Sequence, residues 1–302
     1  MDSNYFQPRE VLYQSASALH TRPRTRNNYR HVHNIVYAEA HGVGLIMDVF
    51  RPLSRATQSG VIDVVSGGWH SGRAMLTEHI GLGLIDALCD RGMTVFAVSP
   101  GSLPLFTGFE MVNHVYAAIR HIKANADDYD IAPDRLGIAG VSAGGHLAAL
   151  AALKPQEAHA RPRAPWQYHG THVKAVALFF PPTDLLDYGG IPITRFCLEG
   201  LDLTRLVFHD GMTHRSETEI AEQLAALSPA RLSPKDPPPF ILVQGKKDLV
   251  VPWRQAEKLA AALRRAGGEA AVLLKDEGGH LWPEIHREVE HVSRWLLENI
   301  NK

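Results

Sequence analysis

The chain has 302 residues, and its 31 basic and 32 acidic side chains leave a formal net charge of −1. This balance gives no electrostatic reason to expect a nucleic acid or an anionic membrane as a partner. The length is sufficient to bury a large core in one α/β domain. Cys89 and Cys197 lie far apart and form no metal-type or redox-type pair, so we interpret both as small buried hydrophobic residues.

The N-terminal region is polar and lacks the apolar core of a signal peptide, which predicts a cytoplasmic location. No apolar run approaches the roughly 20 residues that a membrane-spanning helix needs. Arginine and histidine are frequent in residues 20–33, and a nucleic-acid-binding arm is one interpretation of that cluster. Because Tyr29 is its only aromatic residue besides the histidines and no recognised module is present, we predict a solvated extension over residues 1–33.

From residue 34 onward, extended and helical patterns alternate, which predicts one α/β domain over residues 34–302 with a mostly parallel sheet and helices on both faces. Two short β-type runs joined at residues 41–44 predict an antiparallel hairpin at the sheet edge. Further strands are predicted at residues 61–65, 94–98, 136–139, 173–180, 240–244 and 270–274. Helices are predicted at residues 78–90, 109–124, 217–227, 255–266 and 285–300. Residues 185–235 interrupt the alternation and are predicted to form a cap or lid over the strand ends.

The most informative segment is Gly140-Val141-Ser142-Ala143-Gly144, which follows a buried apolar run and precedes an alanine- and leucine-rich helical stretch. A nucleophile elbow requires this order, because its serine sits on a cramped turn between strand and helix with the hydroxyl exposed. The alternative interpretation is an ordinary glycine-rich turn that closes a βα unit. The pattern favours the elbow and predicts Ser142 as a nucleophile.

A serine nucleophile needs a base to take its proton and a carboxylate to orient that base. Asp248 follows the predicted strand at residues 240–244, and His280 follows the last predicted strand. Catalytic groups in α/β sheets gather outside the carboxyl ends of strands, so we expect Asp248 and His280 to meet Ser142 there. Asp248 is also suited to cap the helix that follows it. Asp184 is the main alternative acid, and Asp276 and Glu277 are rival acids that we expect to shape the His280 loop because they lie so near it.

The same chemistry needs backbone N–H donors for the oxyanion that forms on the substrate. Ala143 follows the nucleophile and is the first candidate. The glycine-rich loop that begins at Ser66, with Gly67, Gly68 and Trp69, follows the third predicted strand, where the second donor loop is expected. An ordinary glycine loop is the alternative interpretation of this segment.

With these residues in place, the chain resembles the α/β-hydrolase superfamily, and within it the small esterases of the acetyl-esterase and bifunctional feruloyl/acetyl-xylan esterase type. The resemblance covers most of residues 34–300. The motifs that carry it are Asp48-Val-Phe-Arg-Pro52, Gly67-Gly68-Trp69, the segment 134–146 around the elbow, Gly245-Lys-Lys-Asp-Leu-Val-Val-Pro252 and Gly278-Gly279-His280.

The resemblance implies Ser142 as nucleophile, His280 as general base and Asp248 as its orienting carboxylate, with the amides of Gly67, Gly68 and Ala143 as oxyanion donors. Two segments depart from the family pattern. The usual His-Gly-Gly-Gly-Trp loop is Val65-Ser66-Gly67-Gly68-Trp69 here, which leaves its anchoring open. The Tyr-Arg and Pro-Glu signature after the next strand is replaced by residues 98–102, so pocket details do not transfer.

We therefore predict a serine hydrolase that cleaves carboxylic esters with a short acyl group, of the acetylated or feruloylated carbohydrate kind, through an acyl-enzyme on Ser142. The expected partner is a small-molecule ester, and no metal, organic cofactor, nucleic acid or membrane is expected. Two alternatives stay open: an amidase or peptidase with the same triad, and a noncatalytic receptor that uses the hydrolase fold. The sequence leaves the oligomeric state open.

Overall fold

The computed structural model describes residues 28–53, 56–195 and 202–302. Their central feature is one eight-stranded sheet in the order β1-β2-β4-β3-β5-β6-β7-β8. The strands are β1 (Tyr29–Ala40), β2 (Val43–Pro52), β3 (Gly60–Val64), β4 (Thr94–Val98), β5 (Leu136–Val141), β6 (Val176–Phe179), β7 (Phe240–Gly245) and β8 (Ala270–Lys275). β1 and β2 pair antiparallel, as do β2 and β4, and all later pairs are parallel.

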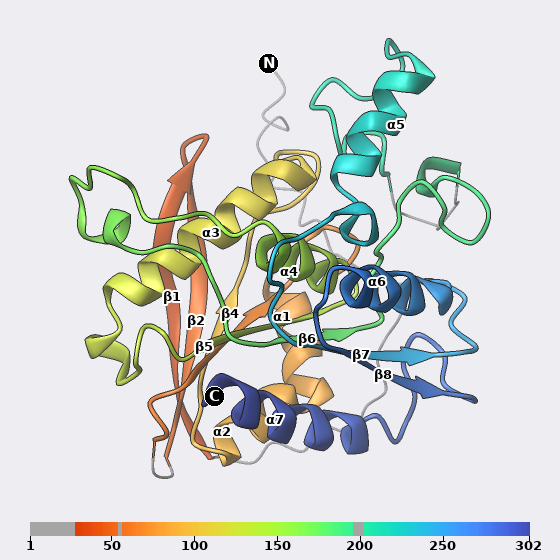
Figure 1. Cartoon of the computed structure of the whole chain (residues 1–302). Coiled ribbons are helices and arrows are strands. Elements are labelled where there is room, and N and C mark those ends of the chain that lie inside the picture. Colours follow the sequence, from red (N-terminus) through yellow and green to blue (C-terminus); the bar gives the residue numbers. More distant parts are fainter. Residues whose placement is uncertain (1–27, 54–55, 196–201) are drawn as a thin grey trace, which may run out of the picture.

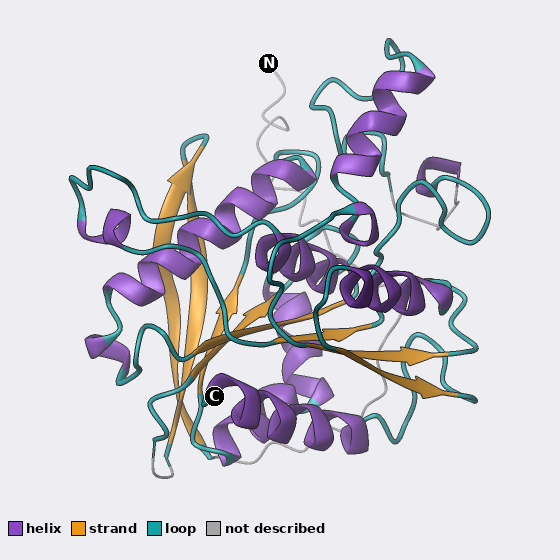
Figure 2. Cartoon of the chain, viewed as in Figure 1, coloured by secondary structure: helices purple, strands orange, loops and turns teal. Residues whose placement is uncertain are grey.

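Helices cover both faces of the sheet (Figures 1 and 2). One face carries α3 (Gly108–Ala124), α4 (Ala143–Leu153) and α6 (Arg254–Arg265), whose apolar residues form one core with the sheet. The other face carries α1 (Arg73–Leu82), α2 (Leu84–Asp90) and α7 (His286–Ile300), which form a second core. The central strands are apolar in almost every position because both of their faces are buried.

The predicted mostly parallel α/β sheet is confirmed, with several strand and helix ends that differ by a few residues from the sequence prediction. β1 begins at Tyr29, so the last residues of the predicted 1–33 extension belong to the sheet. The predicted helix over 78–90 is two helices, because Gly83 adopts φ 83° and ends α1 before α2 begins. Cys89 is buried as expected, whereas Cys197 lies outside the described residues.

The predicted cap, residues 185–235, lies in the long connection between β6 and β7. This segment contains the short turns η3 (Ile193–Arg195) and η4 (Pro229–Arg231) and the helix α5 (Glu217–Ala226). Figure 1 shows α5 standing apart from the two helical layers. The described cap residues contact the body: the Gly108 amide donates to Leu206 O at 2.7 Å and the Ala230 amide to Thr183 O at 2.9 Å. That this cap opens and closes as a lid stays a prediction.

Across the described ranges, no helix is both long enough and apolar enough to cross a bilayer.

Candidate catalytic site

Ser142 lies at the junction between β5 and α4, in the backbone conformation expected of a nucleophile elbow. Its φ of 53° and ψ of −121° are rarely adopted by a residue with a side chain. The neighbouring glycines make this turn possible: a Cβ on Gly144 would lie 2.0 Å from Val64 O, and one on Gly140 would lie 2.5 Å from Gly144. The Ser142 amide donates to Phe179 O at 2.9 Å, which ties the elbow to β6.

Asp248 and His280 meet at the carboxyl ends of β7 and β8. The ring Nδ1–H of His280 donates to Asp248 Oδ2 at 2.8 Å. The Asp248 side chain is fully buried, whereas the His280 side chain keeps 23% of its surface exposed. His280 Nε2 bonds to no other group in the part of the chain that the structure describes, so its lone pair is available to a hydroxyl proton.

Three further hydrogen bonds fix the Asp248 carboxylate. Oδ1 accepts the amides of Val250 and Val251, both at 2.8 Å, and Oδ2 accepts Gln244 Nε2 at 3.0 Å. The carboxylate thus caps its own loop and orients His280 at the same time, so the two interpretations of Asp248 do not exclude each other. Gln244, the penultimate residue of β7, carried no sequence signal beyond its place at a strand end.

The loops that carry the pair are held in contact by backbone groups. The Lys247 amide donates to Gly278 O at 2.8 Å. A Cβ on Gly245 would lie 2.2 Å from Gly279 O and 2.3 Å from Gly278 O, so only glycine allows this approach. The ring of His280 packs against Phe180, with centroids 4.3 Å apart, and Phe180 follows the residue that accepts the Ser142 amide.

The structure therefore brings Asp248 and His280 into direct contact and places Ser142 on the neighbouring part of the same sheet edge. Among the described residues, no hydrogen bond joins the Ser142 hydroxyl to His280 or to another group. Hydrogen bonds between nucleophile and base often tighten only in the substrate complex. The catalytic roles of the three residues stay a prediction.

The competing acids pair with cations elsewhere. Asp184 accepts Arg231 Nε at 2.6 Å and also contacts Lys258. Asp276 pairs with Lys246 at 2.6 Å, and Glu277 pairs with Lys247. These contacts leave Asp248 as the carboxylate that contacts His280.

The predicted oxyanion loop forms a tight turn, and this removes Gly67 from the predicted set of donors. Gly67 and His70 exchange both backbone hydrogen bonds at 2.9 Å, because Gly68 and Trp69 both have positive φ and close a two-residue turn between them. The Gly67 amide is therefore already bonded. Within residues that the structure describes, the amides of Gly68 and Ala143 donate to no acceptor, so these two predicted donors are available.

Hydroxyl groups anchor this loop in place of the histidine and glycine that the family loop usually carries. Ser71 Oγ donates to Val65 O at 2.7 Å and is 2.9 Å from Gly101 O. The Ser71 amide donates to Ser102 Oγ at 2.8 Å. The loop is thus tied to the segment 98–102, where the chain also departs from the family signature.

His146 gives the loop a second anchor that sequence reasoning missed. Trp69 Nε1–H donates to His146 Nδ1 at 3.1 Å, and His146 Nε2–H donates to Leu227 O at 2.7 Å. His146 is completely buried, and desolvation lowers its pKa to about 4. It therefore links the oxyanion loop to the cap as a neutral imidazole. Its place one turn after Ser142, on the same helix, was the available signal.

Two clusters have the composition of metal ligands. In the first, His31 and His33 contact Asp48, but Arg73 also donates to that carboxylate and its fixed positive charge opposes a cation. In the second, Glu110 contacts His41 and His209 while it accepts two hydrogen bonds from Thr107. Both carboxylates are thus already satisfied by protein donors, and we assign no cofactor to either cluster.

The comparisons with known proteins agree with this architecture. A truncated carbohydrate esterase from gut microbiota superposes with a TM-score of 0.76 at 22% identity, covering 93% of this chain and all of that one. The butyrate-bound esterase Est2 of Thermogutta terrifontis superposes at 0.66 with 20% identity, covering 88% and 93%. The fold is therefore that of the α/β-hydrolases.

The BD-FAE family model matches residues 47–263, and the chain belongs to this family. The probable carboxylic ester hydrolase LipM of Mycobacterium tuberculosis is 26% identical over 252 residues, which cover 82% of this chain and 55% of LipM. Esterase LipQ of the same organism is 29% identical over 185 residues, covering 61% and 41%. The chain thus spans about half the length of the curated relatives it matches.

Proposed function

We propose that the protein is a serine hydrolase of carboxylic esters in which Ser142 forms an acyl-enzyme. The observation that carries the proposal is the hydrogen-bonded pair of buried Asp248 and partly exposed His280, at the same sheet edge as the strained turn that carries Ser142. The names of the relatives, a probable carboxylic ester hydrolase and an esterase, support the choice of ester hydrolysis.

In the proposed reaction, His280 Nε2 takes the Ser142 hydroxyl proton as Oγ attacks the ester carbonyl carbon. The amides of Gly68 and Ala143 donate to the oxyanion that forms. The bond between carbonyl carbon and alkoxy oxygen then breaks, and the alcohol leaves with the proton from His280. A water molecule gives its proton to His280, attacks the acyl group and releases the acid, and Ser142 Oγ recovers its proton. Asp248 keeps the Nδ1–H tautomer throughout and stabilises the imidazolium.

We further propose that the substrate is a small ester with a short acyl group, and that acylated carbohydrates are the class to test first. One structural neighbour is a carbohydrate esterase by its name, and others are named as butyrate-bound and propionate-bound esterases. A cytoplasmic location stays a prediction.

The test compares wild type with Ser142→Ala in the hydrolysis of p-nitrophenyl acetate, longer acyl esters, acetylated xylan and the matched anilide. We expect wild type to cleave short esters and Ser142→Ala to lose about 10³-fold or more of kcat. Ser233→Ala, at an exposed serine, is the control and should retain wild-type activity. Unchanged turnover in Ser142→Ala would exclude this nucleophile. Faster anilide cleavage would favour the amidase, and a folded protein that a fluorophosphonate fails to label at Ser142 would favour the receptor.

A further inference from the structure

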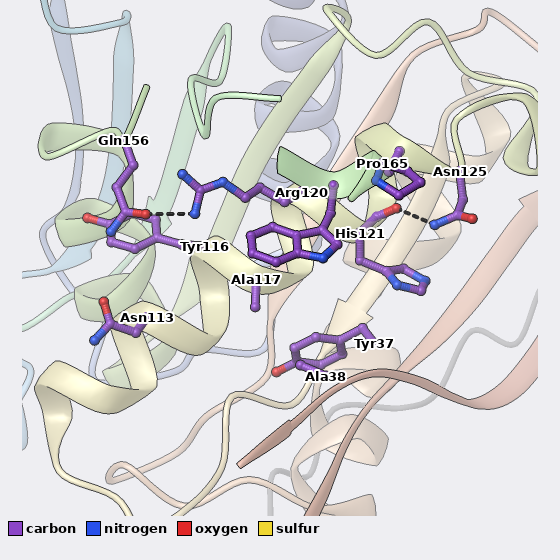
Figure 3. Close-up of a pocket in the computed structure, with 12 residues that line it drawn as sticks. Tyr37, Ala38, Asn113, Tyr116, Ala117, Arg120, His121, Asn125, Gln156 and Pro165 are labelled. Atoms are coloured by element: carbon purple, nitrogen blue, oxygen red, sulfur yellow. Dashed lines mark hydrogen bonds between the residues drawn. The ribbon is translucent and has the colours of Figure 1, made fainter. Parts of the chain in front are cut away.

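A cavity lies away from the predicted catalytic residues, between α3, β1 and the loop over residues 154–171 (Figure 3). Its volume is about 670 Å³, which is in the range of small-molecule sites. Ser142, Asp248 and His280 are not among its lining residues. Nothing in the proposed reaction uses this cavity.

The walls of the cavity are largely apolar and aromatic. Tyr37, Tyr116 and Trp166 line it. The two tyrosine hydroxyls donate to Ser99 O and Lys154 O. A ligand would therefore contact the aromatic rings of these residues and would receive no hydrogen bond from their hydroxyls. Trp166 is 43% exposed although it carries a large indole, whose ring contacts the ring of His159 with centroids 5.4 Å apart. Such walls favour a planar apolar ligand.

Arg120 adds a buried positive charge to this apolar wall. The residue is only 9% exposed. Its guanidinium donates to His169 O at 3.1 Å, Gln156 Oε1 at 2.8 Å and Glu157 O at 3.1 Å, all of them neutral acceptors.

No carboxylate of the described chain pairs with Arg120. The Glu157 carboxylate lies 3.5 Å from His172 Nε2 instead. A buried cation without a counter-ion is unusual, because buried charges in proteins are normally paired. The positive charge of Arg120 is therefore not balanced by a negative charge in the cavity.

The polar groups next to Arg120 are suited to an anionic oxygen. Gln156 uses its Oε1 to accept from Arg120, and its NH₂ group donates to no described residue. The Asn113 amide is also unbonded within the described structure and lies on the exposed side of the cavity. Figure 3 shows Arg120 and Gln156 side by side at one end of the cavity. A carboxylate bound at this end would compensate the charge and accept these donors.

We propose that this cavity binds a small aromatic carboxylate, with the carboxylate at Arg120 and Gln156 and the ring between Trp166 and the tyrosines. This site is independent of the proposed hydrolysis. The class follows from the combination of one unpaired cation with aromatic walls. A neutral sugar would use the indole and the amides but would leave the charge of Arg120 unpaired.

The test is calorimetric titration of the full chain with phenylpropionate, phenylpropanol and xylobiose. We expect phenylpropionate to bind and phenylpropanol, which lacks the charge, to bind at least about tenfold more weakly. Equal binding of acid and alcohol, preferential binding of xylobiose, or no heat with any of the three would overturn the proposal.

Substitutions of exposed cavity residues test where the ligand binds. They avoid replacing the buried Arg120, whose loss could unfold the protein. Trp166→Ala and Asn113→Asp change exposed side chains, and each should weaken phenylpropionate binding about tenfold, the first by loss of stacking and the second by charge repulsion. Thr218→Asp adds the same charge on α5, outside the cavity, and should have no effect. Equal affinity in Asn113→Asp and Thr218→Asp would contradict the site.

Labelling of Ser142 by a fluorophosphonate separates this site from the proposed catalytic site. We expect the labelled protein to bind phenylpropionate as wild type does. Loss of binding after labelling would place the acid at Ser142 and overturn the cavity proposal. Failure of the label to react would count against the proposed hydrolysis only, because the titrations of the cavity variants do not require it.

Discussion

His146 shows how one buried side chain connects two parts of the site. Its Nδ1 accepts from Trp69 in the oxyanion loop, and its Nε2–H donates to Leu227 in the cap. The contact with Trp69 needs the neutral ring, because protonation of Nδ1 would set two donors against each other, whereas Nε2–H donates in either state. The contacts also fix a single tautomer. The position of Trp69, and with it the Gly68 amide, therefore depends on His146 staying uncharged.

This dependence predicts a loss of stability in weak acid. The unfolded chain binds a proton at His146 below its ordinary pKa of 6.5, whereas the folded chain does so only near 4. Protonation therefore favours unfolding as the pH falls from 6.5 to 4, and this residue alone should remove about 3 kcal/mol of unfolding free energy at most. His146→Gln cannot titrate in this range. Urea unfolding at several pH values should show a shallower pH dependence for this variant, and parallel curves would contradict the argument.

Asp248 and Asp184 allow a direct comparison of the two acids that the sequence left open. Asn at position 248 keeps the shape but has only one acceptor oxygen. It cannot accept both the two loop amides that bond to Oδ1 and the Gln244 and His280 donors that bond to Oδ2. We therefore expect Asp248→Asn to lower kcat about 10³–10⁴-fold. Asp184→Asn breaks ion pairs with Arg231 and Lys258 and should leave kcat close to wild type. Ester hydrolysis by both folded variants is the measurement, and a larger loss in Asp184→Asn would reverse the assignment.

At the scale of the elements, glycine positions decide how closely the catalytic loops approach each other. Gly245 ends β7 directly against the backbone of Gly278 and Gly279, in the loop that carries His280. A methyl group there meets carbonyl oxygens that belong to the main chain and cannot rotate away. The Asp248 and His280 loops would have to separate to admit it.

Gly245→Ala should therefore cost about 1–3 kcal/mol of unfolding free energy and also lower kcat, because the Asp248–His280 contact is disturbed. Gly44→Ala is the matched control, since its new Cβ would lie 3.7 Å from Val36 in ordinary contact. Urea unfolding and ester hydrolysis of both variants give the comparison. If Gly245→Ala behaves like Gly44→Ala, the close approach of the two loops is not needed.

The sequence predicted those elements whose pattern depends on burial alone. The strand at residues 94–98 and the helix near 109–124 match β4 and α3 because their apolar residues face one or two cores. Its errors occurred where one backbone angle decides the outcome. The φ of Gly83 splits a helix, and the positive φ values of Gly68 and Trp69 fold the predicted donor loop so that Gly67 bonds to His70. Hydrophobic periodicity carries no information about such angles.

Contacts between distant segments were equally invisible in the sequence. Asp248 and His280 were predicted together because strand ends converge, which is a property of parallel sheets. The role of Gln244 and the link from His146 to Leu227 depend on side-chain directions at single positions. The sequence therefore pointed to the edge of the sheet where the candidate site lies, and the structure supplied the supporting contacts.

At the scale of the whole molecule, Glu110 joins three parts that are far apart in the sequence. It belongs to the capping box of α3 with Thr107. It also contacts His41 at the β1–β2 turn at 3.0 Å and His209 of the cap region at 2.9 Å. Desolvation acts to raise its pKa, but hydrogen bonds from His41, Thr107 and His209 outweigh this and lower it to about 2. The carboxylate thus holds hairpin, helix and cap together.

Glu110→Gln tests this junction, because Gln preserves the capping box but not the charge. We expect a loss of about 1–2 kcal/mol of unfolding free energy at pH 7. The folded pKa is lowered from its ordinary value of 4.5, so the advantage of wild type is complete above pH 4.5 and disappears as the pH falls toward 2. Urea unfolding of both proteins from pH 7 downward should show the two stabilities converging. Glu219→Gln is the control, because its carboxylate forms the same box with Ser216 but contacts no histidine of the described residues. Glu219→Gln should lose less unfolding free energy at pH 7 than Glu110→Gln. An equal loss in the two variants would show that Glu110 acts only as a helix cap.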